Sequence, residues 1–260
     1  MAVINLDQSA EPSADELHCL IMRTMVGINA RGFRAFGNQV LTGPFIGMTI
    51  PERNEAWDDG NSGTKLLGLY EWELNAAFET LFWRRPKTII NVGCAEGYYA
   101  IGFARMFPNI RIYAADILSS CLYLCAEYAA INNVASRIAL IDGCQTPEEM
   151  RFPEIKGHRF YLIDVEGAEI DLVDLERCPE LVNSDLVIEC HDNLRPETTA
   201  DLMDRLSATH RVELIRSRFP DLNQFQFAHI FSAVAAALFA VEKRPQGCYW
   251  LACWANTKGV

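Results

Sequence analysis

The chain has 260 residues, half of them apolar and about a tenth aromatic, and carries a formal charge of −11. This length suits one α/β domain with an extension, or two small domains, and the apolar content is ample for one large core. The acidic balance argues against a nucleic-acid partner, because binding a phosphate backbone requires a basic surface. No apolar run reaches the roughly 18–20 residues of a membrane-spanning helix, so we expect no membrane partner.

Nine cysteines occur, but their positions do not predict a disulfide framework. Most lie in apolar runs, as Cys121, Cys125, Cys190 and Cys253 do, where they behave as small buried hydrophobes. No CxxC pair or zinc-like spacing is present. The N-terminus lacks the basic start and apolar core of a signal peptide. We therefore expect reduced thiols and a cytoplasmic location.

Residues 1–64 show one clear helical pattern, over Ser13–Met25, and are otherwise without a clear period. Ser13 and Glu16 predict a capping box at its start, and the apolar residues that follow recur at helical spacing. The polar stretch Arg53–Thr64 predicts a loop, in which Trp57 is a candidate to cover a pocket. We interpret residues 1–64 as an extension that faces the substrate or forms a lid.

A second helix is predicted over Leu69–Trp83, and from Lys87 onward strand and helix patterns alternate. Nearly continuous apolar strands separated by helices predict a mostly parallel, doubly wound α/β sheet with both faces covered. The connection before the last strand is short. We therefore expect the last strand to enter the sheet antiparallel. The predicted strands are Thr88–Val92, Ile110–Ala115, Arg137–Ile141, Arg159–Asp164, Asp185–Cys190, Arg211–Arg216 and Cys248–Ala255. The predicted helices between them are Tyr98–Phe107, Leu118–Asn132, Ala168–Arg177, Pro196–Ala208 and Phe231–Lys243.

Acidic residues follow most of the predicted strands. The C-terminal ends of parallel strands meet at one edge of an open sheet, and ligands bind there, near the point where strand order reverses. Acids repeated along this edge suit a cationic or hydroxyl-rich ligand. The acids concerned are Glu96, Asp116, Asp142, Asp164, Glu166, Glu169, Glu189 and Asp192, and His191 lies between the last two.

The turn after the first strand reads Gly93-Cys-Ala-Glu-Gly97. Its glycines permit close backbone approach. Dinucleotide folds use G-x-G-x-x-G to place a pyrophosphate at a helix N-terminus, and a carboxylate at Glu96 would repel that group. Asp116, at the end of the second strand, is placed to accept both hydroxyls of a ribose. The alternative is a plain turn followed by a helix-capping aspartate, but the two features together favour a nucleoside that bears an ammonium or sulfonium group.

Residues 87–255 resemble the class I S-adenosylmethionine-dependent methyltransferases, whose first motif runs acid-x-Gly-x-Gly-x-Gly. This sequence has Asn91 in place of the acid and Ala95 in place of the middle glycine. Within that class, LIDVEGAEIDLV (Leu162–Val173) followed by LVIECHDN (Leu186–Asn193) looks like the FkbM-like branch, typically O-methyltransferases of small molecules or sugars. The resemblance implies a seven-stranded Rossmann-like methyltransferase fold, with residues 65–260 as the S-adenosylmethionine-binding catalytic domain.

The resemblance also assigns roles to individual positions. It gives the methionine portion of the cofactor to Gly93–Ala95, the ribose to Asp116, and the adenine to the segment that begins at Asp142. Asp164 would lie near the ammonium or the reacting methyl, and Tyr70–Glu71 would close over the cofactor. The expected cofactor-binding residues are Tyr70, Glu71, Asn91, Gly93, Cys94, Ala95, Glu96, Gly97, Tyr98, Asp116, Ile117, Asp142, Gly143, Asp164 and Val165.

His191 is the candidate general base for a hydroxyl nucleophile, and Asp164 the second candidate catalytic residue. His191 lies beside Asp192, and a neutral imidazole at this edge could take the proton while a carboxylate orients it. Alternatively, Asp164, Glu189, His191 and Asp192 hold Mg²⁺ or Mn²⁺, which would lower the pKa of the hydroxyl. A third interpretation is that Asp192 merely caps the next helix. For the metal we favour that plain interpretation.

Two other functions stay open at this stage. A cofactor-binding scaffold or sensor would explain the loss of the acid at Asn91, whereas an NAD-dependent oxidoreductase is disfavoured by Glu96. The expected partner is a small-molecule acceptor, and a homo-oligomer is compatible with the chain. The aromatic stretch Phe219–Phe231 suits either a substrate wall or core packing. His158 and His210, near strand starts at the opposite edge, are interpreted as structural.

Overall fold

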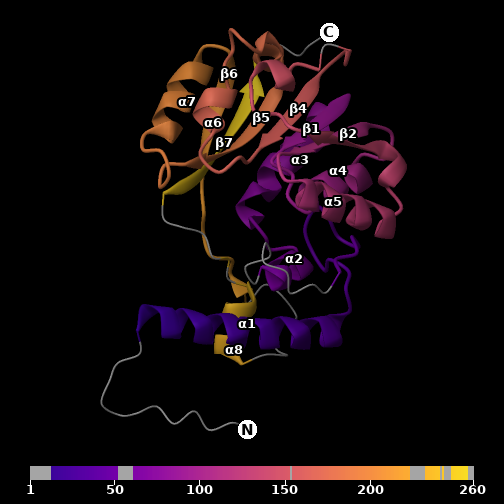
Figure 1. Ribbon diagram of the computed structural model, residues 1–260, viewed down its shortest axis with the longest axis vertical. Coiled ribbons are helices and arrows are strands. Elements are labelled where there is room, and N and C mark those ends of the chain that lie inside the picture. Colours follow the sequence, from indigo (N-terminus) through magenta and orange to yellow (C-terminus); the bar gives the residue numbers. More distant parts are fainter. Residues whose placement is uncertain are drawn as a thin grey trace.

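The computed structural model describes residues 13–51, 61–152, 154–222, 232–240, 242 and 247–256. Within this part of the chain, seven strands form one sheet in the order β3-β2-β1-β4-β5-β7-β6 (Figure 1). β7 runs antiparallel to β5 and β6, and the other neighbours are parallel. The predicted doubly wound, mostly parallel sheet is confirmed, as is the antiparallel last strand. The strands are β1 Thr88–Val92, β2 Arg111–Asp116, β3 Ile138–Asp142, β4 Arg159–Ile163, β5 Asp185–His191, β6 His210–Arg216 and β7 Cys248–Ala255.

Helices cover both faces of the sheet and one of its ends. α3, α4 and α5 contribute to the apolar cluster on one face, and α6 and α7 to the cluster on the other. Neighbouring residues of β1 divide between these clusters, Ile89 to the first and Ile90 to the second, as the alternation of side chains along a strand requires. The described α-helices are α1 Ala14–Phe36, α2 Ser62–Leu67, α3 Asn75–Arg84, α4 Tyr98–Met106, α5 Ser119–Ile131, α6 Glu169–Leu172, α7 Thr198–Ser207 and α8 Ala233–Ala240.

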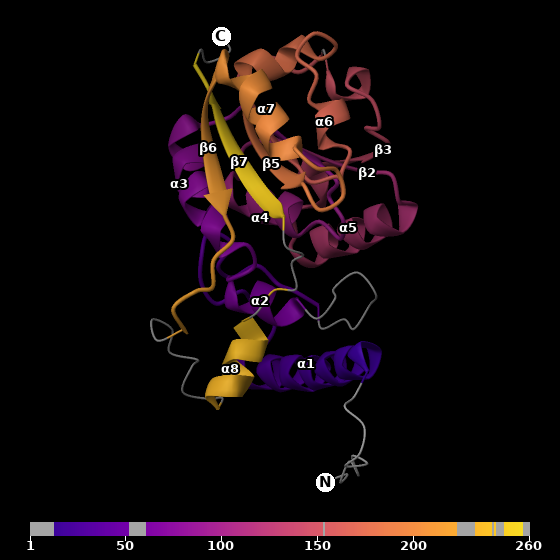
Figure 2. The same ribbon diagram turned by 90° about the vertical axis from the view of Figure 1, so that its left-hand side faces the viewer.

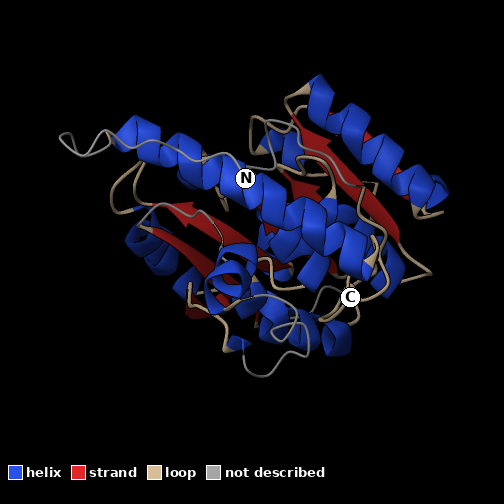
Figure 3. Ribbon diagram, turned by 90° about the horizontal axis from the view of Figure 1, so that it is seen from below, coloured by secondary structure: helices blue, strands red, loops and turns tan. Residues whose placement is uncertain are grey.

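The helix predicted over Ser13–Met25 begins as expected and continues to Phe36. Ser13 and Glu16 form the predicted capping box, and Gly37 ends the helix with φ +77°. Figure 1 shows α1 crossing beyond one end of the sheet with α8 against it, and Figure 3 shows the molecule from below, with a long helix across the near side. Gly32 makes that packing possible, because a Cβ there would lie 2.1 Å from the ring of Phe239. The later part of α1 is thus held by α8, a segment about 200 residues away in sequence.

α1, α2 and α8 lie beyond the end of the sheet toward which the arrow of β6 points (Figure 2). β6 runs antiparallel to β7, as β5 does, so β6 and the parallel strands point the same way. The three helices therefore stand over the edge where a ligand is expected. The division of the chain at residue 64 stays a prediction.

Three predicted elements differ from the structure. The helix expected over Leu69–Trp83 is interrupted at Glu71, whose φ is +48°, because that residue is fixed by Tyr99 and Glu242. Ser62–Thr64, predicted as loop, is the buried start of α2. The helix predicted over Ala168–Arg177 ends at Leu172. The carboxylate of Asp174 accepts hydrogen bonds from two backbone N–H groups that follow it in the chain, and this forms a turn in place of the predicted helix.

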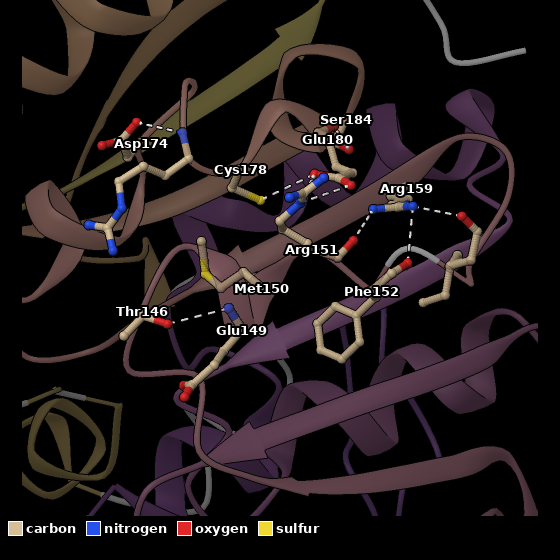
Figure 4. A network of polar contacts seen from close by, with 12 residues as sticks. Thr146, Glu149, Met150, Arg151, Phe152, Arg159, Asp174, Cys178, Glu180 and Ser184 are labelled. Atoms are coloured by element: carbon tan, nitrogen blue, oxygen red, sulfur yellow. Dashed lines mark hydrogen bonds and ion pairs between the residues drawn. The ribbon is translucent and has the colours of Figure 1, made fainter.

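A buried arginine fixes the loop that follows β3 (Figure 4). Arg159, the first residue of β4, donates to the carbonyl oxygens of Arg151, Phe152 and Ile155 at 2.6, 3.2 and 2.6 Å. Arg151 in turn pairs with Glu180 at 3.2 Å. Arginine suits this role because its five donors satisfy several carbonyl groups at once. The loop between β3 and β4 is therefore anchored to the sheet.

All nine cysteines lie in the described residues and are free, eight of them buried. The prediction that they form no disulfide framework is confirmed. Among the described helices, none combines the length and apolarity that crossing a bilayer requires. His158 and His210 are buried and bond to Asp185 and to the Ser184 carbonyl, as the structural interpretation expects. Trp57, His229 and most of Phe219–Phe231 lie outside the described residues.

Candidate functional site

A cavity of about 540 Å³ opens at the C-terminal ends of β1, β2 and β4. The chain runs from β1 outward to β3 on one side and continues through β4 and β5 on the other, so strand order reverses between β1 and β4. Ligands bind at such a reversal in open α/β sheets. The lining residues are Asn61, Lys65, Tyr70, Val92, Gly93, Ala95, Glu96, Asp116, Ile117, Leu118, Cys121, Gly143, Cys144, Gln145, Asp164, Val165, Glu166, Ala168 and Leu172.

The turn after β1 passes extremely close to the turn after β4. A Cβ on Gly93 would lie 1.6 Å from the carbonyl oxygen of Asp164, and the φ of Gly93 is +75°. Ala95, where the related motif has a glycine, also has a positive φ of +45°. A small side chain tolerates this conformation at a cost of about 1 kcal/mol. Only glycine fits at position 93, because the two turns meet there.

Gly93→Ala is expected to lower the free energy of unfolding by about 3 kcal/mol or more, since the new methyl overlaps backbone and the left-handed φ penalises it. Urea unfolding measures the effect. Gly27→Ala is the control, because Gly27 lies in α1 and a methyl group there would have nothing within 4 Å; it should raise stability by roughly 0.5–1 kcal/mol. Equal effects of the two substitutions would contradict the close approach of the two turns.

Asp116 joins the first two strand ends. Its Oδ2 accepts the N–H of Ala95 and its Oδ1 accepts the N–H of Leu118, both at 2.9 Å. The carboxylate is thus fixed in orientation, and it lines the cavity. Each carboxylate oxygen has a second acceptor site, so both remain able to receive hydroxyl groups. The helix-capping alternative describes the bond to Leu118 correctly, but it does not account for the bond to Ala95.

The charge of the cavity wall is strongly unbalanced. Among the described lining residues, four are carboxylates, namely Glu96, Asp116, Asp164 and Glu166, and one is a lysine. Lys65 forms a buried ion pair with Glu96 and lies 4.9 Å from the ring centroid of Tyr70. The argument that Glu96 alone repels a pyrophosphate is therefore wrong, because Lys65 neutralises it. The remaining three carboxylates now carry the preference for a cationic ligand.

Asp164 is the most perturbed of these acids. Burial, together with the nearby charges of Glu71 and Glu166, raises its pKa to about 8. Its Oδ1 is buried and has no hydrogen-bond partner within the described structure. A positive group in the cavity would restore the usual preference of this side chain for the ionised form. Asp164 therefore marks the point of the wall at which a cation is most favourable.

His191 ends β5 and is held by Glu169. Its Nδ1 lies 2.6 Å from Glu169 Oε1, while Nε2 lies 3.4 Å from Glu166 and 3.9 Å from Asp164. Burial favours the neutral imidazole and by itself lowers the pKa of His191. The hydrogen bond to Glu169 and the negative charges of Glu189 and the other nearby carboxylates have the opposite effect and outweigh burial, so the pKa of His191 is raised. His191 is only 4% exposed and does not itself line the cavity.

Asp192, the neighbour of His191 in the sequence, is not the carboxylate that orients the imidazole. It accepts from the backbone N–H of Thr199 at 2.9 Å and from its hydroxyl at 2.6 Å, so it caps α7. The plain interpretation of Asp192 is confirmed. Glu169 takes the expected role instead, because the short α6 brings it beside the end of β5.

A divalent cation could be held by a set that differs from the predicted one. Ligand atoms of Asp164, Glu166 and His191 lie within 4.8 Å of one another, as do those of Glu189, His191 and Cys248. Glu169 would fix the imidazole from behind, as acidic partners of metal-binding histidines do. Asp192 belongs to neither set, since both its oxygens bind Thr199.

The predicted cofactor residues divide into two groups. Those that line the cavity are Tyr70, Gly93, Ala95, Glu96, Asp116, Ile117, Gly143, Asp164 and Val165. Those outside its lining are Glu71, Asn91, Cys94, Gly97, Tyr98 and Asp142. Asp142 is exposed, although β3 places it beside Asp116 in register. Asn91 is 1% exposed, and neither of its side-chain polar atoms has a partner in the described structure.

Sequence reasoning missed several lining residues. Lys65 and Asn61 carry no signal, because the segment before residue 65 has the composition of a polar loop. Cys121 lies in the first turn of α5, where an apolar pattern predicts only core. Glu166 was expected among the acids of this edge but was not assigned to the cofactor, although it follows Asp164 by two residues in the same turn. Cys144 and Gln145 follow Gly143 directly and have no signal of their own.

The comparisons with solved structures find similar chains at low sequence identity. The O-methyltransferase TomG from Streptomyces achromogenes, solved with S-adenosylmethionine, is 13% identical over 89% of this chain and 90% of its own, with a TM-score of 0.48. An rRNA methylase from Streptococcus thermophilus is 9% identical over 70% and 96%, with a TM-score of 0.47. A human methyltransferase 10 domain containing protein is 9% identical over 92% and 97%, with a TM-score of 0.46. Likeness at this level carries no argument about activity.

No family model matches the chain, and no curated protein matches it. The functional conclusion therefore depends on the site itself.

Proposed function

We propose that this protein is an S-adenosylmethionine-dependent methyltransferase that acts on a hydroxyl group of a small molecule. The observation that supports it most is the cavity at the β1/β4 reversal, where Asp116 belongs to a wall with three carboxylates that no lysine of the described lining neutralises. A nucleoside with a sulfonium and an ammonium group supplies the missing positive charge and the ribose. A pyrophosphate-bearing dinucleotide would meet the same wall with the wrong charge.

The residues present fit this cofactor. Asp116 would accept the ribose hydroxyls, the peptide groups from Gly93 to Ala95 would contact the methionine portion, and Asp164 would lie by a positive group. The loop from Gly143 to Gln145 would border the base. When bound, the cofactor supplies a methyl group on a sulfonium centre, which is a good leaving group. The protein then has to align the acceptor and exclude water, which can contribute roughly 7–11 kcal/mol.

His191 is proposed as the general base. Glu169 holds its Nδ1, so the basic position is Nε2, which lies 3.4 Å from the Glu166 carboxylate. The Glu166 side chain is 77% exposed, so it can swing away and let a hydroxyl reach the imidazole. Because the pKa of His191 is raised, the neutral, proton-accepting form requires a higher pH than a free histidine would.

A small acceptor suits the chain better than a nucleic acid, because the formal charge is −11. The segment Leu162–Val173 and the following Leu186–Asn193, whose resemblance is to the FkbM-like branch, form β4, α6 and β5 and supply Asp164, Glu169 and His191. Their placement at one edge supports O-methylation. A cytoplasmic location is proposed from the sequence alone.

Isothermal titration calorimetry with S-adenosylmethionine, S-adenosylhomocysteine and NADH tests the cofactor. We expect both sulfur nucleosides to bind and NADH not to bind. A methyl-transfer screen with hydroxylated acceptors then separates an enzyme from a scaffold or sensor. Binding of both nucleosides without transfer to any acceptor would favour the scaffold, and NADH as the only ligand would refute the proposal.

Metal dependence is a separate prediction. With His191 acting as the base, methyl transfer should persist in EDTA at an unchanged rate, and Mn²⁺ should leave the melting temperature unchanged. Loss of turnover in EDTA, with recovery on adding Mg²⁺ or Mn²⁺, would instead assign Asp164, Glu166 and His191 to a cation. The measurement is the initial rate before and after chelation.

A further inference from the structure

The lining of the cofactor cavity has one cationic side chain among its described residues, and that side chain comes from outside the parallel sheet. It is Lys65 of α2, whereas Glu96, Asp116, Asp164 and Glu166 are acids. The cofactor proposed above carries an α-carboxylate besides its two positive groups. Like charges repel, so Asp116, Asp164 and Glu166 disfavour a carboxylate beside them. Few parts of the cavity wall can therefore bind that group.

Lys65 is held in place and shielded from water. Its ammonium forms an ion pair with Glu96, and only 8% of its side chain is exposed. The nitrogen lies 4.9 Å from the ring centroid of Tyr70 and 5.9 Å from that of Tyr98. Removal of water strengthens the attraction between opposite charges. An ammonium group has three N–H donors, so Lys65 can contact Glu96 and a second carboxylate together.

The ion pair places Lys65 beside the turn that follows β1. The N–H of Ala95 donates to Asp116, and the next residue, Glu96, accepts from Lys65. The proposed ribose acceptor and the lysine are therefore attached to neighbouring residues of one turn. A nucleoside whose ribose is at Asp116, and whose amino-acid chain follows this turn, brings its carboxylate toward Lys65.

The two other helices that stand beyond the sheet hold α2 in position (Figure 2). The amide of Asn29 in α1 donates to the hydroxyl of Ser62 at 3.1 Å. A Cβ on Gly63 would lie 2.5 Å from the ring of Phe239 in α8, so the glycine permits this close approach. All six residues of α2 are buried. We call α1, α2 and α8 together the cap, and the cap determines where the ammonium of Lys65 lies.

We propose that the cap completes the cofactor site, and that Lys65 binds the α-carboxylate of the methionine portion. This inference rests on the proposed function and adds a residue that determines which nucleosides are accepted. Asp164 then faces the positive part of the ligand and Lys65 the negative part. A nucleoside that lacks the carboxylate should therefore bind more weakly. The segment that contains α1 and α2 is thereby part of the ligand site.

A simpler role for Lys65 would be to neutralise Glu96 without touching the ligand. Lys65→Met alone does not separate the two roles, because it leaves the charge of Glu96 in the wall, where it would repel a carboxylate. The double variant Lys65→Met/Glu96→Gln does separate them. It removes both charges of the pair, so the net charge of the wall is unchanged while the donor is lost. Lys65→Gln/Glu96→Gln repeats the measurement with two amides, which can still hydrogen-bond to each other.

The test is calorimetric binding of two matched nucleosides to the full-length protein. One is S-adenosylhomocysteine. The other is 5′-S-(3-aminopropyl)-5′-thioadenosine, which has the same chain and amine but lacks the carboxylate. The variants are Glu96→Gln and the two double variants. The control is Lys87→Met, because Lys87 is exposed and precedes β1 at the opposite edge of the sheet.

The parent should bind S-adenosylhomocysteine about tenfold or more tightly than the amine, as a hydrogen bond between charged groups allows. Both double variants should lose this preference, whereas Glu96→Gln and Lys87→Met should retain it. Affinity for the amine should be similar in the parent and the double variants, because the net charge of the wall is the same. That similarity also shows that the double variants are folded.

Two results would overturn the inference while leaving the proposed function intact. One is equal binding of the two nucleosides to the parent. The other is a preference for S-adenosylhomocysteine that survives in the double variants, which would leave Lys65 only its neutralising role. Failure of both nucleosides to bind the parent would refute the proposed function and this inference together.

Discussion

Replacing His191 by alanine is expected to lower the rate of methyl transfer by ~10²–10⁴-fold, the usual contribution of a positioned base. Nε2 of the imidazole lies 3.9 Å from Asp164 and 3.4 Å from Glu166, two residues that line the cofactor cavity. S-adenosylhomocysteine affinity should change little, because His191 does not line the cofactor cavity. Single-turnover rates measure the loss.

The alanine variant also leaves Glu169 buried without its partner, so stability needs its own control. His191→Asn retains a side-chain donor for Glu169 but has no basic nitrogen, and it should be as slow as the alanine variant with a melting temperature nearer that of the parent. Full turnover in His191→Asn would eliminate the histidine as base.

The pH dependence gives a second readout of the same residue. Since the pKa of His191 is raised, the neutral imidazole is scarce below that value and the rate should rise as pH increases through a midpoint above 6.5. Glu169→Gln removes the carboxylate that stabilises the imidazolium, so it should move the midpoint to lower pH. An unchanged midpoint in Glu169→Gln would assign the titration to another group.

Replacing Asp116 by alanine is expected to weaken S-adenosylhomocysteine binding by ~10–150-fold, which corresponds to roughly 1.5–3 kcal/mol for hydrogen bonds to a charged group. Both its oxygens are fixed by the N–H groups of Ala95 and Leu118 while the carboxylate lines the cavity. Calorimetry measures the affinity directly and does not require knowledge of the acceptor.

Asp142→Asn is the matched control for Asp116. The two aspartates end neighbouring strands in register, but Asp142 is exposed and lies outside the cavity lining. Its substitution should leave affinity within about twofold, since surface substitutions away from a site have small effects. An alanine at position 116 that binds as tightly as the parent, or equal losses in the two variants, would refute the assignment of the ribose site.

The fold and the position of the cofactor cavity follow largely from the sequence. Strand bounds differ from the prediction by one residue at most, because buried parallel strands are short apolar runs that polar residues end sharply. Residues that follow those strands must meet at one edge, so Gly93, Asp116, Gly143 and Asp164 could be placed around one ligand without coordinates.

Partnerships between side chains far apart in sequence needed the tertiary structure. Lys65 neutralises Glu96 and Glu169 orients His191, and neither pairing has a local signal, because each depends on how a helix packs against the sheet. The break at Glu71 likewise reflects contacts with Tyr99 and Glu242 that override helical spacing.

The sequence by itself thus determined which strand ends carry the chemistry. Apolar runs mark the strands, and the acids that follow them mark the C-terminal edge of the parallel sheet. Only the tertiary structure decided which of those acids is neutralised by a lysine and which one holds His191. The physical reason is that the net charge and pKa of a buried site depend on distances between elements, which sequence order does not specify.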